Sequence, residues 1–240
     1  MNSKIATAIK LKNSPVAILA SDQLPEKALR FQKDKWGCVI SMLSAAAKGR
    51  TAAFDQDTAG CLGGATGLAF HRYELGFIEY FLSTGGAGGR EGEFYKRTPE
   101  YAREFINSLP HIDLPAPYIV FKPLETVGSD ETPLAIVFLV NADQLSGLVT
   151  LANYDRPTKD NVTVFFGAGC HSTILETLAQ AQAPQPKALI GLTDPSARKV
   201  IDKDLLSFSL PFARFLELES MVEESFLTKE TWTNLAKRIE

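Results

Sequence analysis

The three cysteines are the residues of this chain whose type and setting most favour chemistry. Each cysteine directly follows a glycine, in the pairs Gly37-Cys38, Gly60-Cys61 and Gly169-Cys170. With glycine at about 7% of residues, chance produces three such pairs roughly 3 times in 10,000. Glycine lets the backbone turn sharply and lets a ligand approach closely. The pattern therefore favours the hypothesis that the three thiols converge on one metal centre as its ligands.

Two kinds of metal centre fit three thiolate ligands. One is a [4Fe-4S] cluster with one iron open to a substrate or to a ligand other than cysteine, and the other is a zinc site that adds His171. The chain has no C-x-x-C pair, however, and the separations between its cysteines match no standard ferredoxin or zinc-finger spacing. The alternative is that all three are small buried hydrophobic residues that pack helix against sheet.

Cys170 has a further interpretation as a catalytic nucleophile. Residues 162–166 are predicted to form a short buried strand, and Gly167 and Gly169 permit a tight turn after it. A helix then begins at Cys170, where unpaired N–H groups and the helix dipole favour a thiolate, so we expect a lowered pKa. His171 is a poor base for this thiol, because neighbouring residues at a helix start do not face each other.

The glycine-rich segments support a different hypothesis, a metal-free protein that binds a small molecule in a glycine-lined pocket. Neither glycine run has the spacing of a dinucleotide-binding loop or a P-loop. In this hypothesis Arg90 or Arg198 holds an anionic group of the ligand. The candidate ligand-binding residues are Gly63, Gly64, Arg90, Gly167, Gly169 and Arg198.

Composition and charge narrow the class of protein. Apolar residues make up 45% and charged residues 22% of the 240 residues, which is ordinary for a globular protein. A formal net charge of -3 and scattered Lys and Arg give no basic patch, so we expect no nucleic-acid partner. The N-terminus lacks the apolar core of a signal peptide, and no apolar stretch is long enough to span a membrane. We therefore expect a cytoplasmic protein with no membrane partner, and its odd number of cysteines argues against a disulfide framework.

Hydrophobic periodicity predicts an α/β protein with a mixed sheet flanked by helices, in a single domain over residues 1–240. Strands are predicted at residues 16–20, 51–54, 118–124, 134–140, 162–166, 187–192 and 206–210. Helices are predicted at residues 3–11, 38–48, 73–82, 99–109, 141–151, 170–183, 211–221 and 229–239. Five aromatic residues are interpreted as core, namely Trp36, Phe165, Phe166, Phe208 and Phe212.

Two parts of the chain follow the same order of elements. In each part a cysteine begins a helix, the helix leads to a strand, and an aspartate follows, Asp55 in the first and Asp194 in the second. An internal duplication with halves at residues 1–110 and 118–240 would produce this order. Residue identity between the two copies is low, so chance recurrence of a common helix-strand unit is the alternative.

Motifs along nearly the whole chain resemble those of a known family. In the second half they are Asp143-Gln144-Leu145, Leu151-Ala-Asn153-Tyr154, Phe166-Gly-Ala-Gly-Cys170-x-Ser172, Asp194-x-Ser196-Ala-Arg198 and Phe208-Ser-x-Pro211-Phe-x-x-Phe215-Leu-Glu217. In the first half they are Cys38 and Asp57-Thr-Ala-Gly60-Cys61-x-Gly63-Gly64. With these motifs the sequence resembles the DUF169 family of uncharacterised prokaryotic proteins. The resemblance implies a single cytoplasmic α/β unit and lends no established activity.

The leading functional hypothesis is therefore a metal-binding or iron-sulfur protein that carries out redox or sulfur chemistry on a small molecule. Its ligands would be Cys38, Cys61 and Cys170. The alternatives are the metal-free binding protein with a glycine-lined pocket and the cysteine-nucleophile enzyme that uses Cys170.

Overall fold

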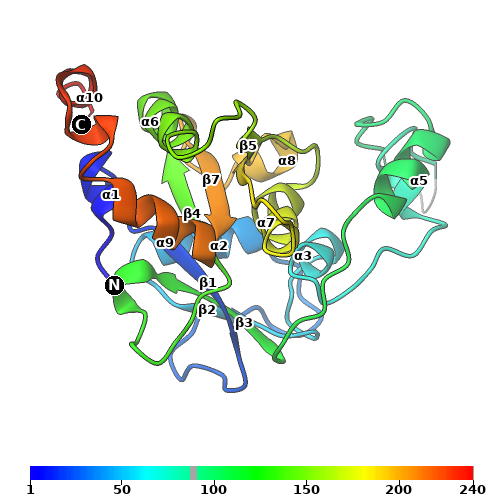
Figure 1. Cartoon of the computed structure of the whole chain (residues 1–240). Helices are drawn as coiled ribbons and strands as arrows, with labels where there is room; N and C mark the ends of the chain where they lie inside the picture. Colours follow the sequence, from blue (N-terminus) through cyan, green and yellow to red (C-terminus); the bar gives the residue numbers. More distant parts are fainter. Residues whose placement is uncertain (87–90, 240) are drawn as a thin grey trace.

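A computed structural model of the chain describes residues 1–86 and 91–239 and has an α/β fold built on one mixed sheet (Figure 1). In these residues the sheet has seven strands in the order β2-β3-β1-β4-β7-β6-β5. The strands are β1 (Val16–Ser21), β2 (Ala52–Phe54), β3 (Tyr118–Pro123), β4 (Ala135–Val140), β5 (Val162–Thr163), β6 (Ala188–Gly191) and β7 (Leu206–Pro211). Neighbouring strands are antiparallel except β5 and β6, which run parallel. The predicted α/β fold with a mixed sheet is confirmed.

Helices cover both faces of the sheet. They are α1 (Lys4–Ala8), α2 (Val39–Ala47), α3 (Leu62–Gly67), α4 (Ile78–Phe81), α5 (Pro99–Asn107), α6 (Ala142–Ala152), α7 (Glu176–Gln180), α8 (Pro195–Arg198), α9 (Phe212–Met221) and α10 (Glu230–Ala236). The described residues also contain the 3-10 helices η2 (Leu124–Thr126) and η4 (Phe226–Thr228) and the π-helix η3 (His171–Leu175). In the described part of the chain, no helix combines the length and apolar character needed to cross a membrane.

Side chains of the strands alternate between two cores. In β4, Val137 and Leu139 belong to the core shared with α2, α3 and α7, whereas Ile136 and Phe138 belong to the core shared with α1, α6, α9 and α10. Successive residues of a strand point to opposite faces, so a sheet covered on both faces needs apolar residues at every position. This explains why the central strands read as continuous apolar runs.

The segment that contains α4 and α5 lies to one side of the sheet. Figure 1 shows α5 at a distance from the layered part of the molecule, on the side of α3 and α7. Helices α4 and α5 pack against each other, and the Arg103 guanidinium lies 3.8 Å from the buried carboxylate of Glu79. This α4–α5 segment forms one wall of the cavity described below.

Several details of the predicted elements are wrong. The strand predicted at 162–166 is limited to Val162–Thr163, because β5 is an edge strand with one neighbour and the chain turns away after it, which leaves the next three residues exposed. Trp36, predicted as core, is 72% exposed. The helix predicted at 73–82 is limited to α4, and α3 forms in a glycine-rich stretch where no helix was expected.

The findings do not support two related halves. Helix α2 connects β1 to β2, which are separated in the sheet by β3, whereas the η3–α7 helix connects β5 to β6, which are direct neighbours. The first helix is a regular α-helix, and the second begins with a π-helical stretch. The two segments therefore share the order of helix and strand, but their strands occupy different positions in the sheet.

Candidate functional site

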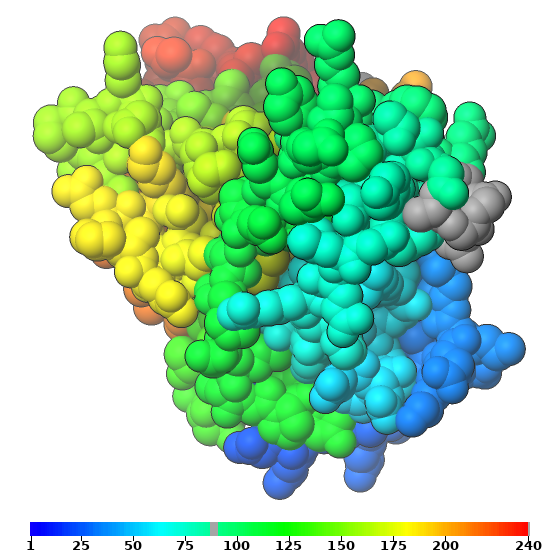
Figure 2. Space-filling model, turned by 90° about the vertical axis from the view of Figure 1, so that its right-hand side faces the viewer, coloured from blue at the N-terminus to red at the C-terminus, as the bar shows by residue number. Residues whose placement is uncertain are grey.

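The three cysteines lie at the starts of three helical segments and line one cavity. Cys38 is the N-cap of α2, Cys61 is the N-cap of α3, and Cys170 directly precedes η3. The cavity has a volume of about 390 Å³. Figure 2 shows this side of the molecule, where cyan and green residues occupy the centre, between yellow residues on one side and blue residues on the other. Segments that are far apart in the sequence therefore meet at this cavity.

Two of the sulfur atoms contact the same peptide group. The Cys170 thiol donates a hydrogen bond to Gly63 O at 3.0 Å, and the N–H of Gly64 donates to Cys61 Sγ at 3.2 Å. Since the C=O and C–N bonds of a peptide are short, the two sulfurs lie within about 9 Å of each other. Burial is the main cause of the raised pKa values of Cys61 and Cys170, and the proximity of Cys38 is a smaller cause for both. All three thiols are thus close enough to influence one another.

Close packing explains the glycines around the thiols. A Cβ on Gly67 would lie 2.6 Å from the Cβ of Cys170, and a Cβ on Gly60 would lie 2.6 Å from Gly37 O. Gly60 also has a φ of +83°, which side chains disfavour. A Cβ on Gly169 would lie 2.7 Å from the Cβ of Ala197. The glycines of the Gly-Cys pairs are therefore required by close packing, and at Gly60 the neighbour is the segment that carries Cys38.

The predicted lowering of the Cys170 pKa is wrong. Burial raises the pKa of Cys170, and burial is also the main cause of the raised pKa of Cys61. At this position, the free-energy cost of removing a thiolate from water exceeds the stabilisation of the thiolate by the start of the helix. The hydrogen bond from the Cys170 thiol to Gly63 O also requires the proton to stay on sulfur. In the metal-free protein Cys170 is therefore a thiol at neutral pH.

We expect iodoacetamide to modify Cys170 more slowly than Cys38 in the reduced, metal-free protein. Cys170 is buried and its pKa is raised, whereas Cys38 is half-buried. Because each unit of raised pKa lowers the thiolate fraction tenfold, the rates should differ by at least about tenfold. Mass spectrometry of peptides after timed reactions measures both rates, and in urea the two rates should become similar. Faster modification of Cys170 would contradict the expectation and favour a nucleophile.

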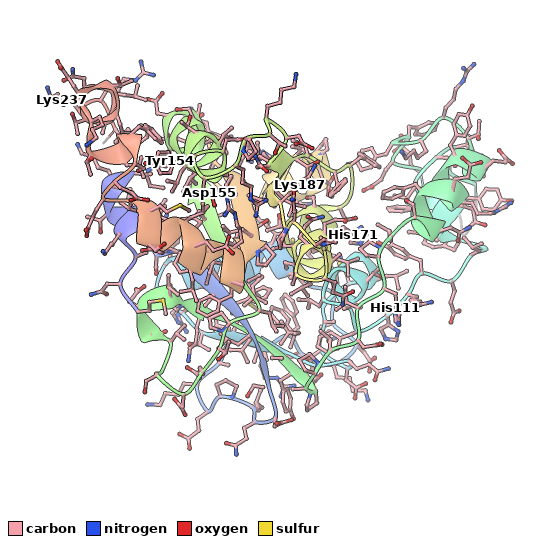
Figure 3. The ribbon with its side chains drawn as sticks, viewed as in Figure 1. His111, Tyr154, Asp155, His171, Lys187 and Lys237 are labelled. Atoms are coloured by element: carbon pink, nitrogen blue, oxygen red, sulfur yellow. The ribbon has the colours of Figure 1, made fainter. Side chains whose placement is uncertain are left out.

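Tyr73 and His171 form a polar pair in the wall of the same cavity. The Tyr73 hydroxyl and His171 Nε2 are 3.1 Å apart, and the two rings meet edge to face. His171 is 2% exposed, and burial lowers its pKa to about 4, so the imidazole is neutral at pH 7. Figure 3 shows His171 on the side of α7 that faces the α4–α5 segment. Among the described residues, His171 Nδ1 has no hydrogen-bond partner.

Aromatic residues make up much of the remaining cavity wall. They are Trp36, Tyr73, Phe77, Phe81, Tyr95, Phe105 and Phe166. The ammonium of Lys96 lies 5.0 Å from the ring centre of Phe105 and 4.4 Å from that of Phe166, which connects the α4–α5 segment to the chain after β5. Sequence analysis interpreted Trp36 and Phe166 as core, and the structure places them in the wall of the cavity.

Asp194 positions the helix that carries Cys170. Its buried carboxylate accepts hydrogen bonds from the N–H of Gly169 at 3.1 Å and from the N–H and hydroxyl of Ser196 at 2.9 and 2.7 Å. It thereby caps two helix starts at once. Two neighbouring acidic groups are affected by burial, since the pKa of Glu93 is raised and that of Tyr95 is raised to about 12.

Some of the predicted ligand-binding residues lie at the cavity and others do not. Gly63 and Gly169 line the cavity, and Gly64 lies beside it as the donor to Cys61. Gly167 packs against the side chain of His171. The guanidinium of Arg198 donates to the carbonyl oxygens of Lys203 and Leu205 and is not part of the cavity wall. Arg90 lies outside the described residues.

The arrangement of ligating side chains bears on the kind of metal centre. Across residues 1–86 and 91–239, no group of three or more His, Cys, Asp and Glu side chains is arranged to hold a single metal ion. His171 Nε2 is also engaged by Tyr73. A zinc site made of the three cysteines and His171 would therefore need rearrangement of these side chains.

Comparisons with known proteins give one match. The model of the DUF169 family, described as uncharacterised ArCR, matches residues 4–221. Searches of curated proteins and of solved structures gave no match.

Proposed function

The chain belongs to the DUF169 family, whose description names no activity, and we propose from the geometry of its cavity that it is an iron-sulfur protein. Cys38, Cys61 and Cys170 are the proposed ligands. The observation that carries the proposal is that three thiols from distant parts of the sequence, each at the start of a different helical segment, line one cavity.

The surroundings of the thiols support a cluster over a single ion. Cys61 and Cys170 lie on opposite ends of one peptide group, and a centre with several metal ions bridges such a separation better than one ion does. The N–H of Gly64 already donates to Cys61 Sγ, and hydrogen bonds of this kind stabilise thiolate ligands. The raised pKa values of Cys61 and Cys170 are compatible with binding of a cluster, because metal binding itself drives the loss of the thiol protons.

The proposed chemistry follows from the number of ligands. Three thiolates leave one iron of a [4Fe-4S] cluster without a cysteine ligand. The aromatic wall of the cavity would hold a small molecule next to the three sulfurs. Redox or sulfur chemistry on that molecule is the reaction class we propose.

Metal and sulfide content test the proposal. Protein purified without oxygen, or reconstituted with ferrous iron and sulfide, should contain about four iron and four sulfide per chain and absorb visible light. Each single variant, Cys38→Ser, Cys61→Ser and Cys170→Ser, should lose most of the iron, with circular dichroism showing that the fold is retained. Ser41→Ala is the matched control, because its hydroxyl bonds to Cys38 O in the first turn of α2. Folded, colourless wild type with three titratable thiols would refute the proposal.

A metal-free binding protein is the second candidate, and the aromatic wall favours it. Apolar and aromatic side chains dominate ligand pockets that hold organic molecules. In this case all three Cys→Ser variants should keep their affinity for a cavity ligand. The cysteine-nucleophile hypothesis is weakened by the raised pKa of Cys170, whose sulfur bonds to Gly63 O and not to a base.

A further inference from the structure

Aromatic rings from distant parts of the chain line the cavity beside the thiols. They belong to Trp36, Tyr73, Phe77, Phe81, Tyr95, Phe105 and Phe166. The face of an aromatic ring carries partial negative charge, so it attracts a cation placed over it. The protein itself gives an example, because the ammonium of Lys96, which is not part of the cavity wall, lies over the rings of Phe105 and Phe166. The wall therefore suits a cation as well as an apolar body.

Glu93, in the α4–α5 segment, adds a carboxylate to the cavity wall. Burial and, after it, the charge of Asp194 raise the pKa of Glu93, and no hydrogen-bond donor or cation of the described residues lowers it. Burial, and to a smaller extent the charge of Glu93, also raises the pKa values of Tyr73 and Tyr95, which line the same cavity. In the described part of the chain, Glu93 is thus a half-buried carboxylate that lies close to other groups of the wall and lacks a positive partner.

The charges of the described wall favour a cation over an anion. Both of its carboxylates, Glu93 and Asp194, are negative, and Asp194 is 4% exposed. Lys199 is the cationic residue among the described lining residues, but it is exposed, so water and salt screen its charge. His171 is neutral at pH 7, since burial lowers its pKa to about 4. A cation in the cavity would be attracted by both carboxylates, whereas an anion would lose its hydration and meet repulsion.

We propose that the cavity binds an organic cation, a protonated or quaternary amine, whose charged head lies between the aromatic rings and the carboxylate of Glu93. Quaternary ammonium groups are cations that aromatic cages in proteins bind, because the ring faces replace a weak hydration shell. The inference deepens the proposed function by naming the class of small molecule, and it rests on that function solely in taking this cavity as the functional site. It requires no cluster, so the two proposals fail separately.

Binding to the reduced, metal-free protein tests the inference with probes of similar shape and different charge. Choline is a cation, neohexyl alcohol has an uncharged tert-butyl group in place of the trimethylammonium group, and the anion of tert-butylacetic acid carries the same group beside a carboxylate. Titration calorimetry at about pH 8, far above the ordinary pKa of a carboxyl group, should give choline an affinity at least about tenfold above those of the other two probes. Choline that binds no better than the alcohol, whether both bind or neither does, or tighter binding of the anion, would overturn the inference.

Glu93→Gln tests the position of the charged head, because it removes the charge and keeps the shape of the side chain. It should lower the affinity for choline at least about threefold and leave that for the alcohol unchanged. Glu91→Gln is the matched control, because Glu91 is close in sequence, exposed and outside the cavity wall. Equal affinity of choline for the two variants would refute the contact with Glu93. Iron content does not enter any of these measurements.

Discussion

Gly67→Ala is expected to lower the free energy of unfolding by about 2 kcal/mol. The new Cβ would lie 2.6 Å from the Cβ and 2.8 Å from the Sγ of Cys170, so α3 and the start of η3 would have to move apart. Alanine favours a helix over glycine by about 0.5–1 kcal/mol, which offsets part of the loss. Because Cys170 would be displaced, the variant should also lose most of its iron under the proposed function. Urea unfolding measured by circular dichroism gives the change in stability.

Gly63→Ala is the matched control for this prediction. It makes the same change in the same helix, but its Cβ would come no closer than 3.4 Å to the Tyr73 hydroxyl oxygen, which is an ordinary contact. We expect this variant to be as stable as the wild type or slightly more stable. If both variants unfold at the same urea concentration, close packing against Cys170 is not what requires glycine at position 67.

The sheet could be predicted from the sequence because its strands are short apolar runs between turn residues. The run predicted at 134–140 appears as Ala135–Val140. The order of the strands could not be predicted, since it depends on pairs such as Val16 with Pro123 that are far apart in the chain. Helix α3 was missed because three of its six residues are glycine, and glycine is a poor helix former. There, packing against η3 outweighs the local preference.

The candidate site could be predicted in part. The Gly-Cys pairs drew attention to three residues that do line one cavity, and the metal they would hold stays a prediction. The pair of Tyr73 and His171 was missed because its members are about a hundred residues apart and no local spacing joins them. The pKa of Cys170 was misjudged because a helix start is a local signal, whereas burial depends on the whole fold. The many aromatic residues from Tyr73 to Phe105 were the available signal for an aromatic wall.

Arg214→Met is expected to lower the free energy of unfolding by about 3 kcal/mol. The Arg214 guanidinium is 2% exposed, makes two 2.6 Å hydrogen bonds to Asp155 (labelled in Figure 3), and also donates to Ala152 O at 3.1 Å. Methionine keeps an apolar stem of similar length but leaves the carboxylate and the carbonyl without their donor. This loss of stability is at the low end of the range for broken buried ion pairs. The reason is that the Asp155 carboxylate is partly exposed, so water can hydrate it when the guanidinium is removed. Urea unfolding at pH 7 measures it.

Arg238→Met is the control, because Arg238 makes the same two-point contact with Asp143 at an exposed position. Exposed ion pairs contribute little to stability, so we expect the free energy of unfolding to change by less than about 0.5 kcal/mol.

The pH dependence of stability provides a second check. The hydrogen bond from Arg214 holds the pKa of Asp155 below its ordinary value of 3.8, so its contribution is present above that pH and is lost as the pH falls through the lower, folded value. The difference in unfolding free energy between the wild type and Arg214→Met should therefore become smaller in acid. If that difference does not change with pH, or if both variants lose equal stability, the buried ion pair is not its cause.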